Sequence, residues 1–256
     1  MPYAVNHDER IHYKIEGGGL PLVLVHPFAG SLEDYYELGF VNELQKAYRL
    51  ILVDSRGHGA SDKPHDPNAY LMQYRVADVI AILDDLMIDK AHFFGYSMGG
   101  RIGFAITKYA PERFYSLIIG GAQPYRNRES AEPHPWIPFL QQGIETAIDK
   151  YTESRGSRIT AERKARLLTN DPDALIAMLS IDETLDQEPD LPMVTIPCLV
   201  YAGSVSHEHE AAKRSVITMQ NASFISLPGL DHYDGLRRSD LVIPIVKDFL
   251  SNQSTT

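Results

Sequence analysis

Short continuous apolar runs, each bounded by turn-forming residues, recur along the chain. Runs of this kind are typical of strands buried on both faces of a parallel sheet. Near the N-terminus the pattern changes to alternation, and residues 3–6 and 10–15 around a polar turn predict a β-hairpin. Buried strands are predicted at residues 21–26, 50–53, 91–94, 116–119 and 198–201, with a weaker one at 222–227.

Segments with apolar residues at helical spacing separate these strands. Ser31 is a candidate N-cap for the first of them, and Pro244 is expected in the first turn of the last. Alternating strands and helices predict an α/β fold in which helices cover both faces of a mostly parallel sheet. The helices are predicted at residues 31–47, 71–87, 98–109 and 241–250.

One long segment, residues 123–191, interrupts the alternation because it contains no good strand. Asp171 followed by Pro172 is a strong helix-start signal within it. A segment of roughly 70 residues is too long for a plain crossover connection. We therefore expect a helical cap at 123–191 inserted into a core domain formed by residues 1–122 and 192–256. The helices of the cap are predicted at residues 139–151, 161–168 and 172–181.

Composition and charge narrow the class of protein. Of the 256 residues, 44% are hydrophobic and 23% are charged, as in an ordinary globular domain. The formal charge of −10 disfavours binding to nucleic acid or to an anionic membrane surface. No apolar run approaches the ~18–20 residues of a membrane span, and the first residues lack a signal-peptide pattern. With the single cysteine Cys198, these features predict a cytoplasmic protein without internal disulfides.

The strongest chemical signal is Gly95-Tyr96-Ser97-Met98-Gly99, which lies directly between a predicted strand and a predicted helix. This is the context of a nucleophile elbow, where a tight turn projects the serine hydroxyl above the sheet. Glycines two residues on either side allow close approach of backbone. We predict Ser97 as a nucleophile, with the Met98 N–H as a donor to an oxyanion.

A serine of ordinary pKa needs a general base to become a nucleophile. His232 is the candidate, because it follows the last predicted strand and comes after the nucleophile in the chain. His92 is a poorer candidate, since it lies inside a buried strand where a hydrogen-bonded core imidazole is expected.

With these residues the chain resembles the α/β-hydrolase superfamily, in particular its capped esterase, lactonase and C–C hydrolase branch. His26-Pro27-Phe28-Ala29-Gly30 is similar to the oxyanion loop of that family, although Pro27 replaces the usual glycine. The segment 54–62, Asp-Ser-Arg-Gly-His-Gly-Ala-Ser-Asp, matches a second family loop. The resemblance implies that the Phe28 N–H is the second oxyanion donor and that His26 and Asp54 shape loops around the site.

The acid of the expected triad is missing from its usual place. The resemblance implies an aspartate three residues after Gly203, but that position is Ser206. Glu208, two residues further on, has a longer side chain and is our candidate for the acid. The alternatives are a Ser97–His232 dyad or a protein with little activity.

These features predict a serine hydrolase that cleaves a small-to-medium carboxylic ester, lactone or thioester through an acyl-serine intermediate. Trp136, Phe139 and Leu140 of the cap are expected to line an apolar substrate pocket, or else to form the cap's own core. C–C bond hydrolysis or lyase chemistry on the same scaffold, and a weakly catalytic ligand-binding protein, stay open as alternatives.

No cofactor or metal is expected, because the chain lacks dinucleotide and phosphate-loop motifs and a serine mechanism needs no metal. The pair His207 and His209 is better explained as solvated loop residues than as metal ligands. The expected partner is a small-molecule substrate, and the sequence leaves the oligomeric state open.

Overall fold

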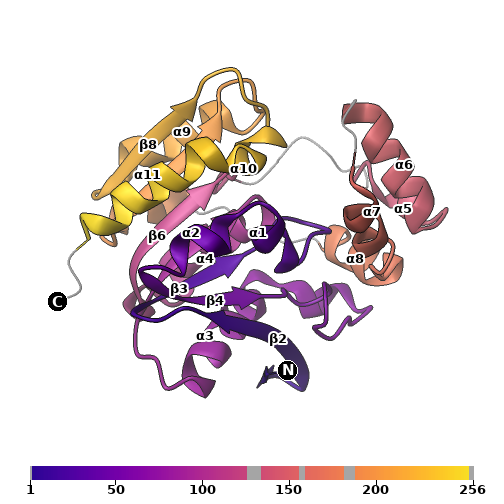
Figure 1. Cartoon of the computed structure of the whole chain (residues 1–256), viewed down its shortest axis with the longest axis horizontal. Helices are drawn as coiled ribbons and strands as arrows, with labels where there is room; N and C mark the ends of the chain where they lie inside the picture. Colours follow the sequence, from indigo (N-terminus) through magenta and orange to yellow (C-terminus); the bar gives the residue numbers. More distant parts are fainter. Residues whose placement is uncertain (1, 126–133, 156–158, 182–187, 254–256) are drawn as a thin grey trace.

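The computed structural model describes residues 2–125, 134–155, 159–181 and 188–253. An eight-stranded sheet runs through the molecule in the order β1-β2-β4-β3-β5-β6-β7-β8 (Figure 1). The pairs β1–β2 and β2–β4 are antiparallel, and the other neighbouring pairs are parallel. The strands are β1 (Tyr3–Asn6), β2 (Glu9–Glu16), β3 (Leu20–Val25), β4 (Tyr48–Val53), β5 (Ala91–Tyr96), β6 (Phe114–Gly120), β7 (Cys198–Gly203) and β8 (Ala222–Leu227).

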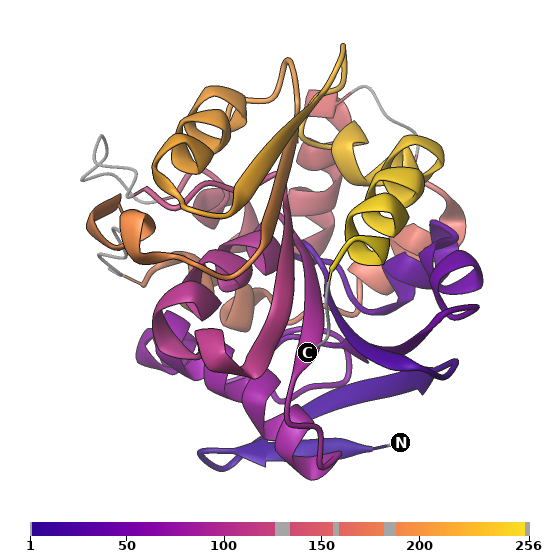
Figure 2. The same cartoon turned by 90° about the vertical axis from the view of Figure 1, so that its left-hand side faces the viewer.

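Helices cover both faces of this sheet, as the view in Figure 2 shows. Successive residues of a strand point to opposite faces, so Val23 and Val25 pack with α3 and α4, while Leu22 and Leu24 pack with α1, α2 and α11. These helices are α1 (Glu33–Glu37), α2 (Phe40–Leu44), α3 (Met72–Asp85), α4 (Met98–Tyr109), α9 (His209–Thr218), α10 (Asp234–Arg237) and α11 (Ser239–Ser251), with 3-10 turns η1 (Pro67–Tyr70) and η2 (Pro111–Arg113).

A helical insertion separates β6 from β7 and lies beside the arrowhead ends of the strands (Figure 1). Asp171 caps its last helix by accepting from the N–H groups of Asp173 and Ala174, as the Asp-Pro signal predicted. The insertion contains α5 (Ile137–Leu140), α6 (Ile144–Arg155), α7 (Ala161–Leu167) and α8 (Pro172–Leu179), followed by the 3-10 turn η3 (Glu188–Met193).

The predicted α/β-hydrolase architecture and every predicted strand are confirmed. The division into a core domain (1–122 and 192–256) and a cap (123–191) stays a prediction. Parts of that cap, residues 126–133, 156–158 and 182–187, lie outside the described residues.

Four predictions about helices are wrong in detail. The single helix expected over 31–47 is two short helices, because Gly39 between them has φ +80°. Gly143, with φ +113°, likewise separates α5 from α6 where one helix was expected. Ser31 caps neither helix, and Pro244 is not in a first turn, since α11 already begins at Ser239.

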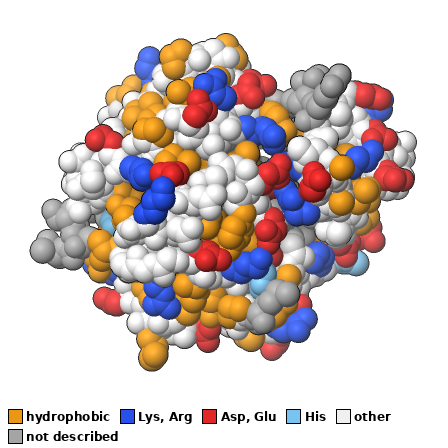
Figure 3. All heavy atoms as spheres, in the orientation of Figure 1, with side chains coloured by type: hydrophobic (Ala, Val, Ile, Leu, Met, Phe, Trp, Pro, Cys, Tyr) orange, Lys and Arg blue, Asp and Glu red, His pale blue; other side chains and the backbone are white. Residues whose placement is uncertain are grey.

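The surface view in Figure 3 shows acidic and basic side chains interspersed over one face of the molecule. Within the described parts of the chain, none of the helices has both the length and the apolarity that crossing a bilayer requires.

Candidate active site

Ser97 occupies a tight turn between β5 and α4. Its φ of 53° and ψ of −110° are unusual for a residue with a side chain, and its N–H donates to Gly120 O at 2.8 Å. A Cβ added at Gly95 would lie 2.2 Å from Gly99 O, and one added at Gly99 would lie 2.1 Å from Val25 O. Only glycine fits at these two positions, so the local sequence dictates the strained turn that presents Ser97.

His232 lies in the loop between β8 and α10 and faces Ser97. Its Nε2 atom is 3.0 Å from Ser97 Oγ, which is within hydrogen-bond reach. The backbone oxygen of His232 accepts from the Tyr96 hydroxyl at 2.5 Å. Because Tyr96 directly precedes Ser97, this bond ties the loop of the histidine to the loop of the serine.

The side chain of Glu208 contacts the ring of His232, whereas the side chain of Ser206 contacts Glu208. Glu208 Oε2 lies 3.1 Å from His232 Nδ1, and the same oxygen accepts from the Ser206 hydroxyl. His232 and Glu208 are close enough to form an ion pair. The geometry at His232 Nδ1 does not meet the criteria of a hydrogen bond to any of the described residues. The second oxygen, Oε1, is 2.6 Å from Nε2 of His207, a largely exposed histidine.

The electrostatics of Glu208 favour its ionised form. Its side chain is 12% exposed, and this burial by itself raises the pKa of the carboxyl. Interactions with His207, His232 and Ser206 outweigh burial, so the pKa of Glu208 lies well below its ordinary value of 4.5. Glu208 is therefore a carboxylate at neutral pH, able to stabilise a positive charge that forms on His232.

His26 holds the predicted oxyanion loop, residues 26–30. Its Nε2 accepts the Ser55 N–H at 3.1 Å, so its Nδ1 carries the proton and donates to Pro27 O at 2.8 Å. The Gly30 N–H donates to the same oxygen at 3.0 Å. Because C=O and N–H point in opposite directions across a trans peptide, these two bonds orient the Phe28 N–H.

The Met98 N–H, the other predicted donor to the oxyanion, belongs to the first residue of α4 and therefore has no partner within that helix. The side chains of Phe28 and Met98 pack in one apolar cluster with Tyr70 and Met178. This packing brings together the two residues whose N–H groups were predicted as oxyanion donors.

His58, a residue that was not predicted to belong to the site, supports the same loop. Its Nε2 accepts the Ala29 N–H at 3.0 Å, and its Nδ1 lies 3.1 Å from Arg56 O. Burial lowers the pKa of His26 and lowers that of His58 well below 6.5. Both rings are neutral and keep an acceptor nitrogen. Its position within the 54–62 motif was the feature of the sequence that could have indicated a role for His58.

Asp54 lies at the base of this region and holds loops, the role that the resemblance implied. Its two carboxylate oxygens accept from the N–H groups of Leu32 and Ala60 at 2.8 and 3.0 Å. Nδ1 of the buried His12 lies 2.8 Å from Oδ2. With these partners Asp54 joins β2 to the loops that follow β3 and β4.

The three aromatic and apolar residues predicted for the substrate pocket pack within the insertion. Leu140 is buried in a cluster with Leu175, and Trp136 and Phe139 pack against this cluster. Phe28 of the oxyanion loop contacts the same cluster. The insertion's own core therefore extends to the oxyanion loop, and the two predicted roles of these residues are not exclusive.

A series of aromatic rings also links the insertion to His232. The rings of Trp136 and Tyr151 are 5.9 Å apart, and those of Tyr151 and Tyr233 are 5.8 Å apart. Tyr233 directly follows His232. The face of the insertion near His232 is thus aromatic.

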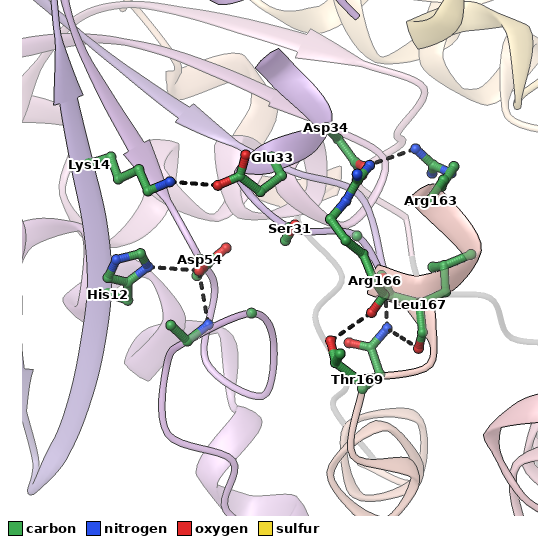
Figure 4. Close-up of a pocket in the computed structure, with 15 residues that line it drawn as sticks. His12, Lys14, Ser31, Glu33, Asp34, Asp54, Arg163, Arg166, Leu167 and Thr169 are labelled. Atoms are coloured by element: carbon green, nitrogen blue, oxygen red, sulfur yellow. Dashed lines mark hydrogen bonds and ion pairs between the residues drawn. The ribbon is translucent and has the colours of Figure 1, made fainter. Parts of the chain in front are cut away.

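A separate cavity of about 270 Å³, with charged side chains in its lining, lies beside the predicted oxyanion loop (Figure 4). Ala29 and Gly30 line it from the core, and ion pairs between Lys14 and Glu33 and between Arg163 and Asp34 border it. Neither Ser97 nor His232 lines this cavity. It is therefore distinct from the apolar substrate pocket that the sequence predicted.

A small cluster of possible cation ligands lies at the start of α8. Among the described residues, ligand atoms of His65, Asp171 and Asp173 lie within 4.8 Å of one another. Both oxygens of Asp171 are engaged, one by N–H groups of α8 and the other by His65 at 3.0 Å. The group is a helix cap with an exposed histidine, and the site chemistry described above does not involve it.

Comparison with known proteins gives a consistent picture. The sequence profile of a family described as "alpha/beta hydrolase fold" matches residues 21–172. The chain is 31% identical over 168 residues to 3-oxoadipate enol-lactonase 2 of Acinetobacter baylyi, covering 62% of each protein. It is 40% identical over 100 residues to esterase YbfF of Escherichia coli, covering 38% of this chain and 37% of that protein. The matches thus span less than two thirds of these relatives.

Among solved structures, the enol-lactonase from Burkholderia xenovorans LB400 is similar over the whole chain. The two structures share a TM-score of 0.83 at 23% sequence identity, covering 98% of this chain and all of that one. At this identity the likeness is one of fold.

Proposed function

The chain belongs to the α/β hydrolase fold family, and we propose that it is a serine hydrolase of esterase or lactonase type. The observation that carries the proposal is the 3.0 Å contact between Ser97 Oγ and His232 Nε2, with Glu208 Oε2 3.1 Å from the other ring nitrogen. A nucleophile, a base and a group that stabilises the charged base are the parts of a triad.

In the proposed mechanism Ser97 Oγ attacks the substrate carbonyl carbon while His232 Nε2 takes the hydroxyl proton. The N–H groups of Phe28 and Met98 donate to the oxyanion of the tetrahedral intermediate. His232 then returns the proton to the leaving alcohol or thiol, which leaves an acyl-serine. Water, deprotonated by His232, attacks this ester, and release of the acid regenerates Ser97.

The proposed substrate is a small-to-medium carboxylic ester, lactone or thioester with an apolar part. The similarity to an enol-lactonase and to an esterase supports this class. The apolar part would contact Trp136, Phe139 and Leu140, whose cluster adjoins Phe28. The ionised carboxylate of Glu208 supports catalysis over the ligand-binding alternative, which was prompted by Ser206 at the usual acid position.

The proposal is tested with p-nitrophenyl esters of increasing acyl length and with simple lactones, using wild type and Ser97→Ala. We expect wild type to turn over short and medium chains and Ser97→Ala to lose several orders of magnitude in kcat. The thermal midpoint should be unchanged, because the hydroxyl contributes little packing.

Near-wild-type turnover by Ser97→Ala would contradict the proposal. Product analysis separates the remaining alternative, since ester or lactone hydrolysis yields an acid and an alcohol without cleaving a C–C bond.

A further inference from the structure

Ala29 has a strained backbone conformation directly after Phe28, one of the two proposed oxyanion donors. Its φ of +58° lies in the left-handed region, which is unfavourable for a residue with a side chain. Such a conformation persists only where the surroundings hold it. Two side chains hold Ala29: His58 Nε2 accepts its N–H at 3.0 Å, and Asn170 Nδ2 donates to its C=O at 2.9 Å.

These two side chains come from different parts of the fold. His58 belongs to the core loop after β4, whereas Asn170 follows α7 in the helical insertion and is 9% exposed. Asn170 is itself positioned, because its Nδ2 also donates to Leu167 O at 3.2 Å. The insertion therefore reaches the oxyanion loop through a directed hydrogen bond as well as through apolar packing.

Ion pairs fasten α7 to α1, the helix that follows the oxyanion loop. Arg163 Nη1 lies 2.8 Å from Asp34 Oδ1, and Arg166 pairs with Glu37. Figure 4 shows Arg163 and Arg166 directed at Asp34 beside the 270 Å³ cavity. Asp34 and Arg163 are buried, so solvent screens their attraction only weakly. These ion pairs fix the position of α7, and with it Asn170, relative to the oxyanion loop.

We propose that Asn170 is a positioning residue that holds the oxyanion loop in its catalytic conformation and couples the insertion to turnover. The inference rests on the proposed acyl-serine mechanism. The Ala29 carbonyl that Asn170 holds shares a peptide group with the Gly30 N–H, which donates to Pro27 O. Without the bond from Asn170 this peptide turns and Gly30 no longer holds Pro27 O. The Pro27–Phe28 peptide then turns its N–H away from the oxyanion. Because that donor acts on the transition state, its misplacement lowers kcat rather than raising KM.

The test uses Asn170→Asp, which keeps the size of the side chain but cannot donate to the Ala29 carbonyl at neutral pH. The matched control is Thr169→Ala, because Thr169 is exposed and its hydroxyl donates to Arg166 O within α7. With a p-nitrophenyl ester, we expect Asn170→Asp to lower kcat and kcat/KM equally, by about tenfold or more. Removing a whole oxyanion donor costs about 10²–10³-fold. Thr169→Ala should match wild type.

A second readout separates positioning from a merely structural role. Phenylboronic acid mimics the tetrahedral intermediate, since Ser97 Oγ bonds to boron, the serine proton passes to His232 and the boronate becomes anionic. Its affinity should fall about tenfold in Asn170→Asp, in step with kcat. Binding of phenol, a ground-state mimic, should change less than twofold.

Unchanged kcat and boronate affinity in Asn170→Asp would overturn the inference, and so would a lower thermal midpoint as the sole effect. Ser97→Ala is measured in the same assay. If Ser97→Ala stays active, the acyl-serine mechanism itself has failed; if it is inactive while Asn170→Asp equals wild type, only the role of Asn170 has failed.

Discussion

At the scale of single residues, the central feature is the carboxylate of Glu208, which lies two positions after Ser206, the residue at the usual acid position. Glu208 is the residue that precedes α9, and its side chain has one methylene more than aspartate. From there it lies 3.1 Å from His232 Nδ1, while Ser206 donates a hydrogen bond to the same carboxylate. The serine at the usual acid position therefore orients the carboxylate that we propose as the acid.

We expect Glu208→Gln to lower kcat for a p-nitrophenyl ester by at least tenfold. The amide keeps the size of the side chain but loses the charge that stabilises protonated His232, and loss of such a partner costs about 10⁴-fold in other triads. Ser206→Ala should change kcat little. The matched control is Glu210→Gln, because the Glu210 side chain is 84% exposed and contacts His209 rather than His232.

A rescue experiment follows from the same geometry. Ser206→Asp introduced into the Glu208→Gln background should restore activity, because it puts the charge at the position implied by the family resemblance. Unchanged turnover in Glu208→Gln alone would reject Glu208 as the acid and leave a Ser97–His232 dyad. Steady-state kcat at one pH is sufficient for this comparison.

At the scale of elements, the junction of β5 and α4 depends on backbone contacts that leave no space for a side chain. Gly99 lies in the first turn of α4 against the backbone of Val25 in β3. Intrinsic helix propensity favours alanine over glycine by about 1 kcal/mol, so propensity and packing oppose each other here. Packing decides, because the obstructing atoms belong to the central sheet.

Gly99→Ala should accordingly destabilise the protein, by about 3 kcal/mol in the free energy of unfolding, the upper part of the range for overpacking. The added Cβ would lie 2.1 Å from Val25 O. The control is Gly18→Ala, where an added Cβ meets nothing within 4 Å. Urea unfolding of both variants measures the effect, and a Gly99→Ala protein as stable as wild type would contradict this account.

At the scale of the whole molecule, the sheet buries a neutral histidine that must gain a proton when the chain unfolds in acid. His92 of β5 is 1% exposed, and its Nδ1 lies 2.8 Å from Ser116 Oγ of β6. Burial lowers its pKa from 6.5 to about 4. Between these two values the unfolded chain binds more protons, so the free energy of unfolding falls as the pH falls.

His92→Gln keeps a hydrogen-bonding side chain but removes the titration. The contribution of His92 is complete above pH 6.5 and is lost as the pH falls to about 4. The difference in unfolding free energy between pH 7 and pH 4 should therefore be smaller in His92→Gln than in wild type, by roughly 3 kcal/mol at most. Urea unfolding at both pH values checks this, with His7→Asn in the exposed hairpin turn as the control. Equal pH dependence in His92→Gln and wild type would contradict it.

The sequence by itself was sufficient for every strand and for the elbow around Ser97. Both are determined by local sequence. A strand is indicated by an apolar run bounded by turn residues, and the elbow by glycines two positions on either side of a serine. It was also sufficient to select His232 and Glu208 as partners of Ser97, although their catalytic roles stay predictions. The helix errors at Gly39 and Gly143 arose because helical periodicity continues across a glycine that can take a positive φ.

Only the tertiary structure decided which residues from distant segments meet. The reach of Glu208 to His232 depends on how β7 and β8 are paired, since each residue follows one of those strands. The bonds of His58 and Asn170 to Ala29 join residues 29 and 141 positions apart. No local pattern encodes such contacts, because they depend on how the sheet and the helical insertion pack, and packing is a property of the whole chain.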